Sequence, residues 1–159
     1  MYILQKVYNE ITPSEDAYTA VLILPSTPPN EMTRFAQLVQ SVFKALNEES
    51  RDNKSWVLKV LNQNEQDRSP ESNYSCIYNA DIVIAECSEK KPNVFYMIGI
   101  AHAVGRPVCS CYKIVADQKA DIPFNVYGRQ SMMYSLSTIG HQKDFKKHLT
   151  EWIKQYEKN

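Results

Sequence analysis

The sequence predicts an α/β protein, a three-layer sandwich in which helices cover both faces of a parallel sheet of about five strands. Short apolar segments rich in β-branched residues alternate with longer segments of helical periodicity, and this alternation is typical of a parallel sheet with crossover helices. The chain has 159 residues, which is enough for one core without a disulfide or metal. We therefore expect residues 1–159 to form a single domain.

The expected strands are short, apolar and bounded by turn residues. They are residues 17–24, 55–61, 81–86, 107–112 and 129–135, and residues 1–8 could form an extra edge strand or an arm. The expected helices are residues 30–49, where seven apolar positions recur at helical spacing, a short helix from Ser69 through Ile77, residues 92–104, and a C-terminal helix from Lys143.

The stretch 77–108 organises the rest of the chain. Residues 81–86 form an apolar run with an acid at each end, which suits a buried central strand. A polar loop follows, and then a helix that should begin at Pro92 and stop at Gly105. Because ligands of open α/β sheets bind beyond the carboxyl ends of the strands, we expect a pocket over residues 86–97.

Composition excludes several classes of protein. Lys and Arg number 18, as do Asp and Glu, so a general nucleic-acid or anionic-membrane binder is not expected. No apolar run approaches the ~20 residues that span a bilayer, and the first residues do not resemble a signal peptide, which predicts a cytoplasmic protein. With four glycines, neither a dinucleotide-binding fingerprint nor a phosphate-binding Walker loop can be written.

The cysteines and histidines do not form a metal-binding pattern. Cys76, Cys87, Cys109 and Cys111 show no paired spacing, so reduced packing thiols are expected, and the three histidines lack partners at ligand spacing. We predict no metal and no cofactor. Cys87 follows a strand inside the expected pocket, where it is either a small lining residue or a reactive thiol.

Several of these segments together resemble a known family. The run from Ala80 to Glu86, PNVFY at 92–96, IGIAHA at 98–103 before Gly105-Arg106-Pro107, and Ile122-Pro123-Phe124-Asn125 are similar to the nucleoside 2-deoxyribosyltransferase-like superfamily, a flavodoxin-like (Rossmann-like) group related in shape to TIR domains. The resemblance covers roughly residues 18–135. It implies a flavodoxin-like fold, a nucleotide- or nucleoside-type ligand and a homo-oligomer. Trp152 and Tyr156, which widen the apolar surface of the C-terminal helix, independently predict a subunit contact.

Two departures from the family pattern bear on catalysis. Family enzymes look like NVFYELG where this chain reads NVFYMIG from Asn93, so Met97 stands at the position where the resemblance implies a catalytic glutamate. Asn125 likewise stands where it implies an acid. Cleaving an N-glycosidic bond requires a carboxylate at the sugar, and methionine can neither attack nor carry charge. Met97 is expected to point toward the helix start and the ligand; the alternative is that it fills the core.

The candidate ligand contacts come from adjacent carboxyl-end loops and the helix start. They are Leu24, Pro25, Ser26, Thr27, Glu86, Cys87, Ser88, Asn93, Tyr96, Met97, Phe124 and Asn125. Several have plainer alternatives. Ser26, Thr27 and Asn93 could only cap helices, Glu86 could hold ribose hydroxyls or face solvent, and Tyr96 could be a core aromatic.

The expected function is therefore binding without turnover. The ligand would be a nucleotide, nucleoside or ADP-ribose-type molecule, and capturing it could sense or sequester a nucleotide signal, such as in phage-bacterial immunity. One alternative is an active nucleoside deoxyribosyltransferase or nucleotide N-glycosidase that uses Glu86, Glu89 or an acid from a neighbouring subunit. Another is an interaction module with a vestigial pocket.

Overall fold

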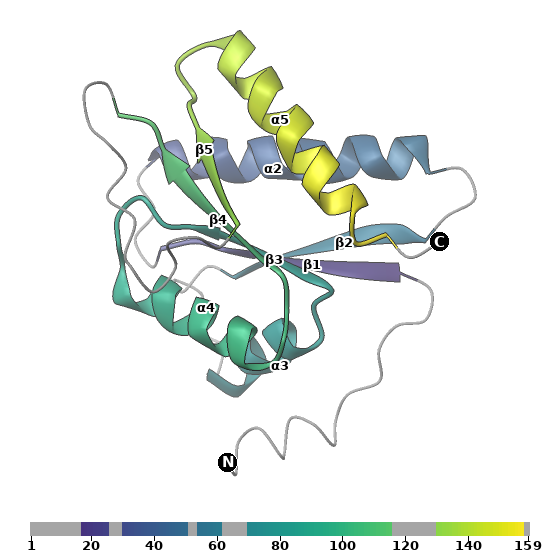
Figure 1. Ribbon diagram of the computed structural model, residues 1–159, viewed down its shortest axis with the longest axis vertical. Coiled ribbons are helices and arrows are strands. Elements are labelled where there is room, and N and C mark those ends of the chain that lie inside the picture. Colours follow the sequence, from purple (N-terminus) through teal and green to yellow (C-terminus); the bar gives the residue numbers. More distant parts are fainter. Residues whose placement is uncertain (1–16, 26–29, 51–53, 62–69, 116–129, 158–159) are drawn as a thin grey trace.

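The computed structural model describes residues 17–25, 30–50, 54–61, 70–115 and 130–157. Helices lie on both faces of one central sheet, with α2 and α5 on one side and α3 and α4 on the other (Figure 1). In chain order the elements are β1 (Ala17–Ile23), α2 (Asn30–Glu49), β2 (Ser55–Leu61), α3 (Pro70–Tyr78), β3 (Ile82–Glu86), α4 (Pro92–Ala103), β4 (Val108–Lys113), β5 (Ser131–Tyr134) and α5 (Ile139–Lys154).

The five described strands are all parallel and lie in the order β2-β1-β3-β4-β5. This is the flavodoxin-like order, in which the strand sequence reverses between β1 and β3. The predicted fold class is therefore confirmed. Ligands of open α/β sheets bind at such a reversal, beyond the carboxyl ends of the strands, and the ends of β1 and β3 are at Ile23 and Glu86.

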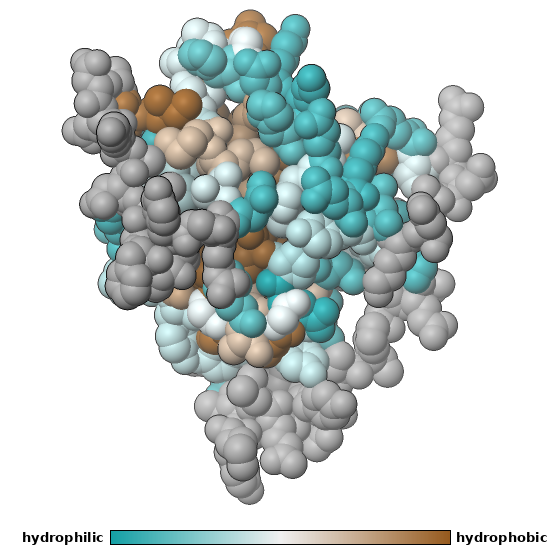
Figure 2. All heavy atoms as spheres, in the orientation of Figure 1, coloured by the Kyte–Doolittle hydropathy of each residue, from teal (hydrophilic) through white to brown (hydrophobic). Residues whose placement is uncertain are grey.

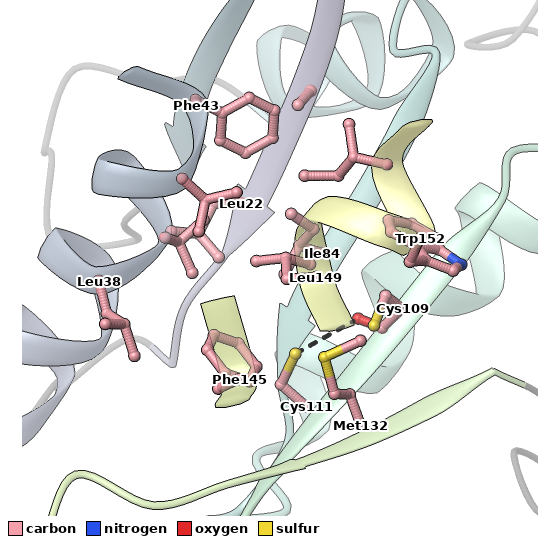
Figure 3. Close-up of a cluster of buried hydrophobic side chains, with 14 of the residues drawn as sticks. Leu22, Leu38, Phe43, Ile84, Cys109, Cys111, Met132, Phe145, Leu149 and Trp152 are labelled. Atoms are coloured by element: carbon pink, nitrogen blue, oxygen red, sulfur yellow. Dashed lines mark hydrogen bonds between the residues drawn. The ribbon is translucent and has the colours of Figure 1, made fainter. Parts of the chain in front are cut away.

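Alternating side chains of the strands build two apolar layers. In β3, Ile82 and Ile84 join the layer under α2 and α5, whereas Val83 and Ala85 join the layer under α3 and α4. β3 is buried along its whole length, as its apolar composition predicts. Figure 3 shows the first layer, in which Leu22 and Ile84 of the sheet pack against Phe145 and Leu149 of α5 and near Leu38 and Phe43 of α2.

The helices follow the predicted amphipathic patterns. The apolar positions of α2 that are buried are Met32, Phe35, Leu38, Val39, Val42, Phe43 and Leu46. Hydrophilic residues gather over the outward side of α5, opposite the buried face that holds Phe145, Leu149 and Ile153 (Figure 2). Each fully buried Leu, Ile or Phe side chain stabilises the fold by about 1.5–3 kcal/mol.

The start of α4 agrees with the sequence prediction, and the start of α5 does not. α4 begins at Pro92 as predicted, and Gly105 follows its end with a φ of 73°, in the left-handed region that glycine adopts without strain. The predicted start of α5 at Lys143 is wrong. The helix begins at Ile139, because the Thr138 side chain accepts a hydrogen bond of 3.2 Å from the His141 amide and caps the first turn.

The prediction that Trp152 and Tyr156 widen the apolar surface of α5 is wrong for Trp152. Trp152 is only 3% exposed and packs within its own protomer, with its ring 5.1 Å from that of Tyr156. Homo-oligomer formation stays a prediction. The expected strand or arm at residues 1–8 lies outside the described residues, and none of the described helices is both long and apolar enough to cross a membrane.

Candidate functional site

The candidate site lies where β1 and β3 end and α4 begins. Leu24 continues from β1, and its amide donates to the Leu61 carbonyl of β2 at 3.3 Å. After β3 the chain turns through residues 87–91, closed by a hydrogen bond of 3.1 Å from the Lys90 amide to the Cys87 carbonyl. Lys90 has a φ of 50°, a left-handed conformation that a residue with a side chain rarely adopts. This turn fixes where α4 starts relative to the sheet.

Glu86 is the buried acid of this edge, and it is only 1% exposed. Its Oε1 accepts hydrogen bonds from the Ser88 amide at 3.2 Å, from the Ser88 hydroxyl, and from the Tyr134 hydroxyl at 2.9 Å. The Ser88 hydroxyl in turn accepts from the Lys113 amide at 2.7 Å. One network therefore joins the ends of β3, β4 and β5, and the alternative that Glu86 faces solvent is wrong.

The second carboxylate oxygen of Glu86, Oε2, lacks the hydrogen bonds that Oε1 accepts. Glu86 Oε2 is buried, and no hydrogen bond reaches it from the described part of the chain. Burial raises the pKa of Glu86, hydrogen bonds from Ser88 and Tyr134 oppose that rise, and the nearby Glu89 charge adds to it. Burial, and then the charge of Glu86, raise the pKa of Tyr134, so the Tyr134 hydroxyl keeps its proton and acts as a donor.

On the other face of the sheet, the end of β3 meets β4 and α4 through Cys87. The Cys87 thiol lies near Ser110 and Tyr112 and is buried. Burial, followed by the charge of Glu86, raises the pKa of Cys87 to about 12. Because the thiolate is the nucleophile, this thiol is unreactive at neutral pH, and the structure supports the small lining residue over the reactive thiol.

Two more polar groups are buried at this edge. Among the described residues, Asn93 Nδ2 makes no hydrogen bond, and Tyr112 Oη makes none of normal geometry, although the Cys87 thiol, a weak partner, lies near it. Asn93 lies in the first turn of α4, whose N-cap, Lys91, provides no side-chain cap. Leaving a buried polar group unpaired costs about 1–3 kcal/mol, so such groups point to a ligand or an ordered water.

Met97 packs beneath this edge. It is 3% exposed and belongs to the apolar layer that contains Ala85 of β3 and Val94, Ile98 and Ala101 of α4. The structure therefore supports the alternative in which Met97 fills the core. Glu86 lies on the α2 and α5 face of the sheet, whereas Met97 lies on the α3 and α4 face, so the two side chains approach the edge from opposite sides.

The structure does not bring every predicted contact together. Tyr96 is 61% exposed, so it is not a core aromatic. Its hydroxyl lies 3.1 Å from the Tyr74 hydroxyl of α3, at the surface and not beside the buried Glu86. Leu24 and Pro25 lie at the end of β1 as expected, and both are buried. Four other predicted contacts, Ser26, Thr27, Phe124 and Asn125, lie outside the described residues.

Sequence reasoning missed two residues of this edge, Tyr134 and Tyr112. Tyr134 reaches Glu86 from 48 positions further along the chain, and no local pattern signals that pairing. Tyr112 is the last but one residue of β4. It follows Cys111, which pairs with Glu86 at the end of β3, so the strand order alone would have placed Tyr112 beside the turn after β3. Within the described residues, no three side chains of His, Cys, Asp or Glu lie close enough to bind a metal ion.

Comparison with known proteins shows a similarity of structure and none of sequence. No protein-family model matches the chain, and no curated protein matches its sequence. Among solved structures, the fold is similar to that of the Clostridium botulinum CMP N-glycosidase BcmB, with a TM-score of 0.51, 15% sequence identity, and coverage of 84% of this chain and 98% of that chain. At this level of identity the similarity establishes the shared flavodoxin-like fold.

Proposed function

We propose that the protein binds a nucleotide or nucleoside at the carboxyl edge of its sheet and does not cleave it. The observation that carries the proposal is that three polar atoms around this edge are buried without a hydrogen bond, Glu86 Oε2 on the α2 and α5 face of the sheet and Asn93 Nδ2 and Tyr112 Oη on the α3 and α4 side. They offer both acceptors and donors, which suits the hydroxyl and carbonyl groups of a nucleoside. The fold similarity to a CMP N-glycosidase supports a ligand of this class.

The chemistry of the described acids supports binding without turnover. Cleavage needs a carboxylate at the sugar carbon, and Met97 occupies the position where the family resemblance implies one. Glu86 has one oxygen fully engaged by three donors, which suits a fixed binding group better than a nucleophile that must form a bond. Such a protein would sense or sequester its ligand, for example a nucleotide signal.

A thermal-shift screen tests the proposal. The probes are CMP, cytidine, 2′-deoxycytidine, NAD, ADP-ribose and cyclic nucleotides, and each mixture is then separated by chromatography. A ligand at 100 times its Kd adds about 2.7 kcal/mol of stability, which raises the Tm of a domain of this size by about 5–10 °C. A shift with unchanged ligand supports binding, and no shift with any probe contradicts it.

Tyr112 provides a sharper version of the test. Because its hydroxyl is buried and unpaired, Tyr112→Phe should leave the Tm of the unliganded protein unchanged or higher, yet reduce the shift that a ligand produces. Tyr156→Phe, which removes a hydroxyl near the end of α5, is the matched control and should change neither value. A full ligand shift in Tyr112→Phe would remove Tyr112 from the site.

The second candidate function is an N-glycosidase in which Glu86 is the reacting acid. The fold similarity to BcmB and the presence of one buried carboxylate at the carboxyl edge favour it. Released cytosine or nicotinamide in the chromatograms would establish this function. Met97→Glu, with Met97→Gln as the uncharged control, then asks whether a carboxylate at position 97 permits cleavage. Base release by the glutamate variant alone would support the proposal that the unmodified protein binds its ligand without cleaving it.

A further inference from the structure

We propose that Ser88 and Tyr134 are positioning residues that fix Glu86 so that its free oxygen, Oε2, accepts a hydrogen bond from one hydroxyl or amino group of the ligand. This assignment rests on the proposed function, because Glu86 Oε2 is named as the atom of that site that recognises the ligand. Ser88 and Tyr134 have the additional role of holding Glu86 in place, and neither needs to touch the ligand.

The two carboxylate oxygens of Glu86 differ in their hydrogen bonds. Oε1 accepts from the Ser88 amide, the Ser88 hydroxyl and the Tyr134 hydroxyl, which exhausts the directions in which one oxygen can accept. Oε2 is buried and accepts nothing from the described residues. A ligand can therefore pair with Oε2 only, so Glu86 cannot bind two adjacent hydroxyls with one oxygen each.

Both donors are held in place by the fold. The Ser88 hydroxyl accepts from the Lys113 amide at 2.7 Å, so its own proton is directed at Glu86. The Tyr134 ring packs against the rings of Phe35 and Phe145, with centroid distances of 4.4 and 5.7 Å. Neither donor needs to reorganise when a ligand binds, which is what a precise binding group requires.

The electrostatic surroundings of Glu86 also support this role. The titratable groups that interact with Glu86 are Glu89 in the following turn, Cys87 at the end of β3, Cys111 and Tyr112 on β4, and Tyr134 on β5, and none of them is a cation. The side chains that α2 and α5 pack around Tyr134 are aromatic. In the described part of the chain no ion pair involves Glu86, so its ionised form depends on the hydrogen bonds from Ser88 and Tyr134.

The test begins with the unliganded protein. Titration of the Glu86 carboxyl is followed by NMR of protein labelled with ¹³C-glutamate, and Glu86→Gln assigns the resonance by its loss. Tyr134→Phe and Ser88→Ala should each raise the titration midpoint of Glu86 by about one pH unit or more, because each removes a hydrogen bond to the anion. Ser88→Thr, which keeps a hydroxyl, should restore it, and Tyr156→Phe and Ser41→Ala are the controls.

The second readout is calorimetry with CMP at two pH values, one below and one above the Glu86 midpoints that NMR gives for the Tyr134→Phe and Ser88→Ala variants. Glu86→Gln replaces the free acceptor by a donor and should weaken binding about tenfold or more at both pH values. Tyr134→Phe and Ser88→Ala should weaken binding more at the lower pH than at the higher, because raising the pH restores the carboxylate in these variants. A purely structural role would weaken binding equally at both.

The outcomes are separable. If CMP does not bind the unmodified protein, the proposed function fails for this ligand, and the NMR titration still decides whether Ser88 and Tyr134 hold Glu86 ionised. An unchanged Glu86 midpoint in both variants would overturn the positioning role. Binding of CMP that is unaffected by Glu86→Gln would overturn the assignment of Oε2 as the ligand acceptor.

Discussion

Truncation of Met97 should destabilise the protein strongly, because its side chain belongs to the apolar layer between α4 and the sheet. Met97 is 3% exposed and shares this layer with Ile23, Ala85, Val94 and Ile98. Met97→Ala removes the buried thioether and leaves a cavity, and such substitutions cost about 2–5 kcal/mol. Against a total stability of about 5–15 kcal/mol for a domain, this is a large fraction.

Urea unfolding followed by circular dichroism measures the effect. Two variants bracket it: Met97→Leu conserves most of the volume and should cost less than about 1.5 kcal/mol, and Met133→Ala, at a methionine that is 40% exposed on β5, should cost far less than Met97→Ala. A Met97→Ala variant within about 0.5 kcal/mol of the unmodified protein would refute the placement of Met97 in the core. It would then favour a side chain that lines an open pocket.

Three other predictions follow from single residues. Burial raises the folded-state pKa of Glu86 above its ordinary value of about 4.3, so its contribution to stability is complete below that pH and is lost as pH rises through the folded-state pKa. The free energy of unfolding of the unmodified protein minus that of Glu86→Gln should accordingly fall as the pH rises above about 4.3, and a constant difference would contradict this. Native protein at pH 8 should react with iodoacetamide at the half-buried Cys76 long before Cys87, which mass spectrometry of the digested protein can show; early labelling of Cys87 would contradict its burial. Asn47→Ala should cost about 1–3 kcal/mol in urea unfolding, because the Asn47 side chain pairs with both the amide and the carbonyl of Trp56 at 2.7 and 2.9 Å, and an unchanged midpoint would show that water replaces it.

Most helices and strands, and with them the class of fold, could be predicted from local sequence patterns. Residues 82–85 are apolar at every position and rich in β-branched side chains, a pattern typical of a strand buried on both faces. Pro92 and Gly105 marked the ends of α4 through backbone chemistry that acts locally. Because the strands are parallel, a site is expected at the carboxyl edge of the sheet. The family resemblance around Met97 predicts that its ligand is a nucleotide or nucleoside.

Tertiary structure decided which side chains meet at that edge. Glu86 pairs with Tyr134 across 48 positions of sequence, and only the strand order places β5 within reach of β3. Most residues of α4 are apolar, so its sequence does not indicate which side of the helix faces the sheet. In the folded protein, Met97 lies in the core and Tyr96 lies beside Tyr74 at the surface. Hydrogen bonds and packing between distant segments depend on three-dimensional register, so the partners of Glu86 could be found only once the fold was known.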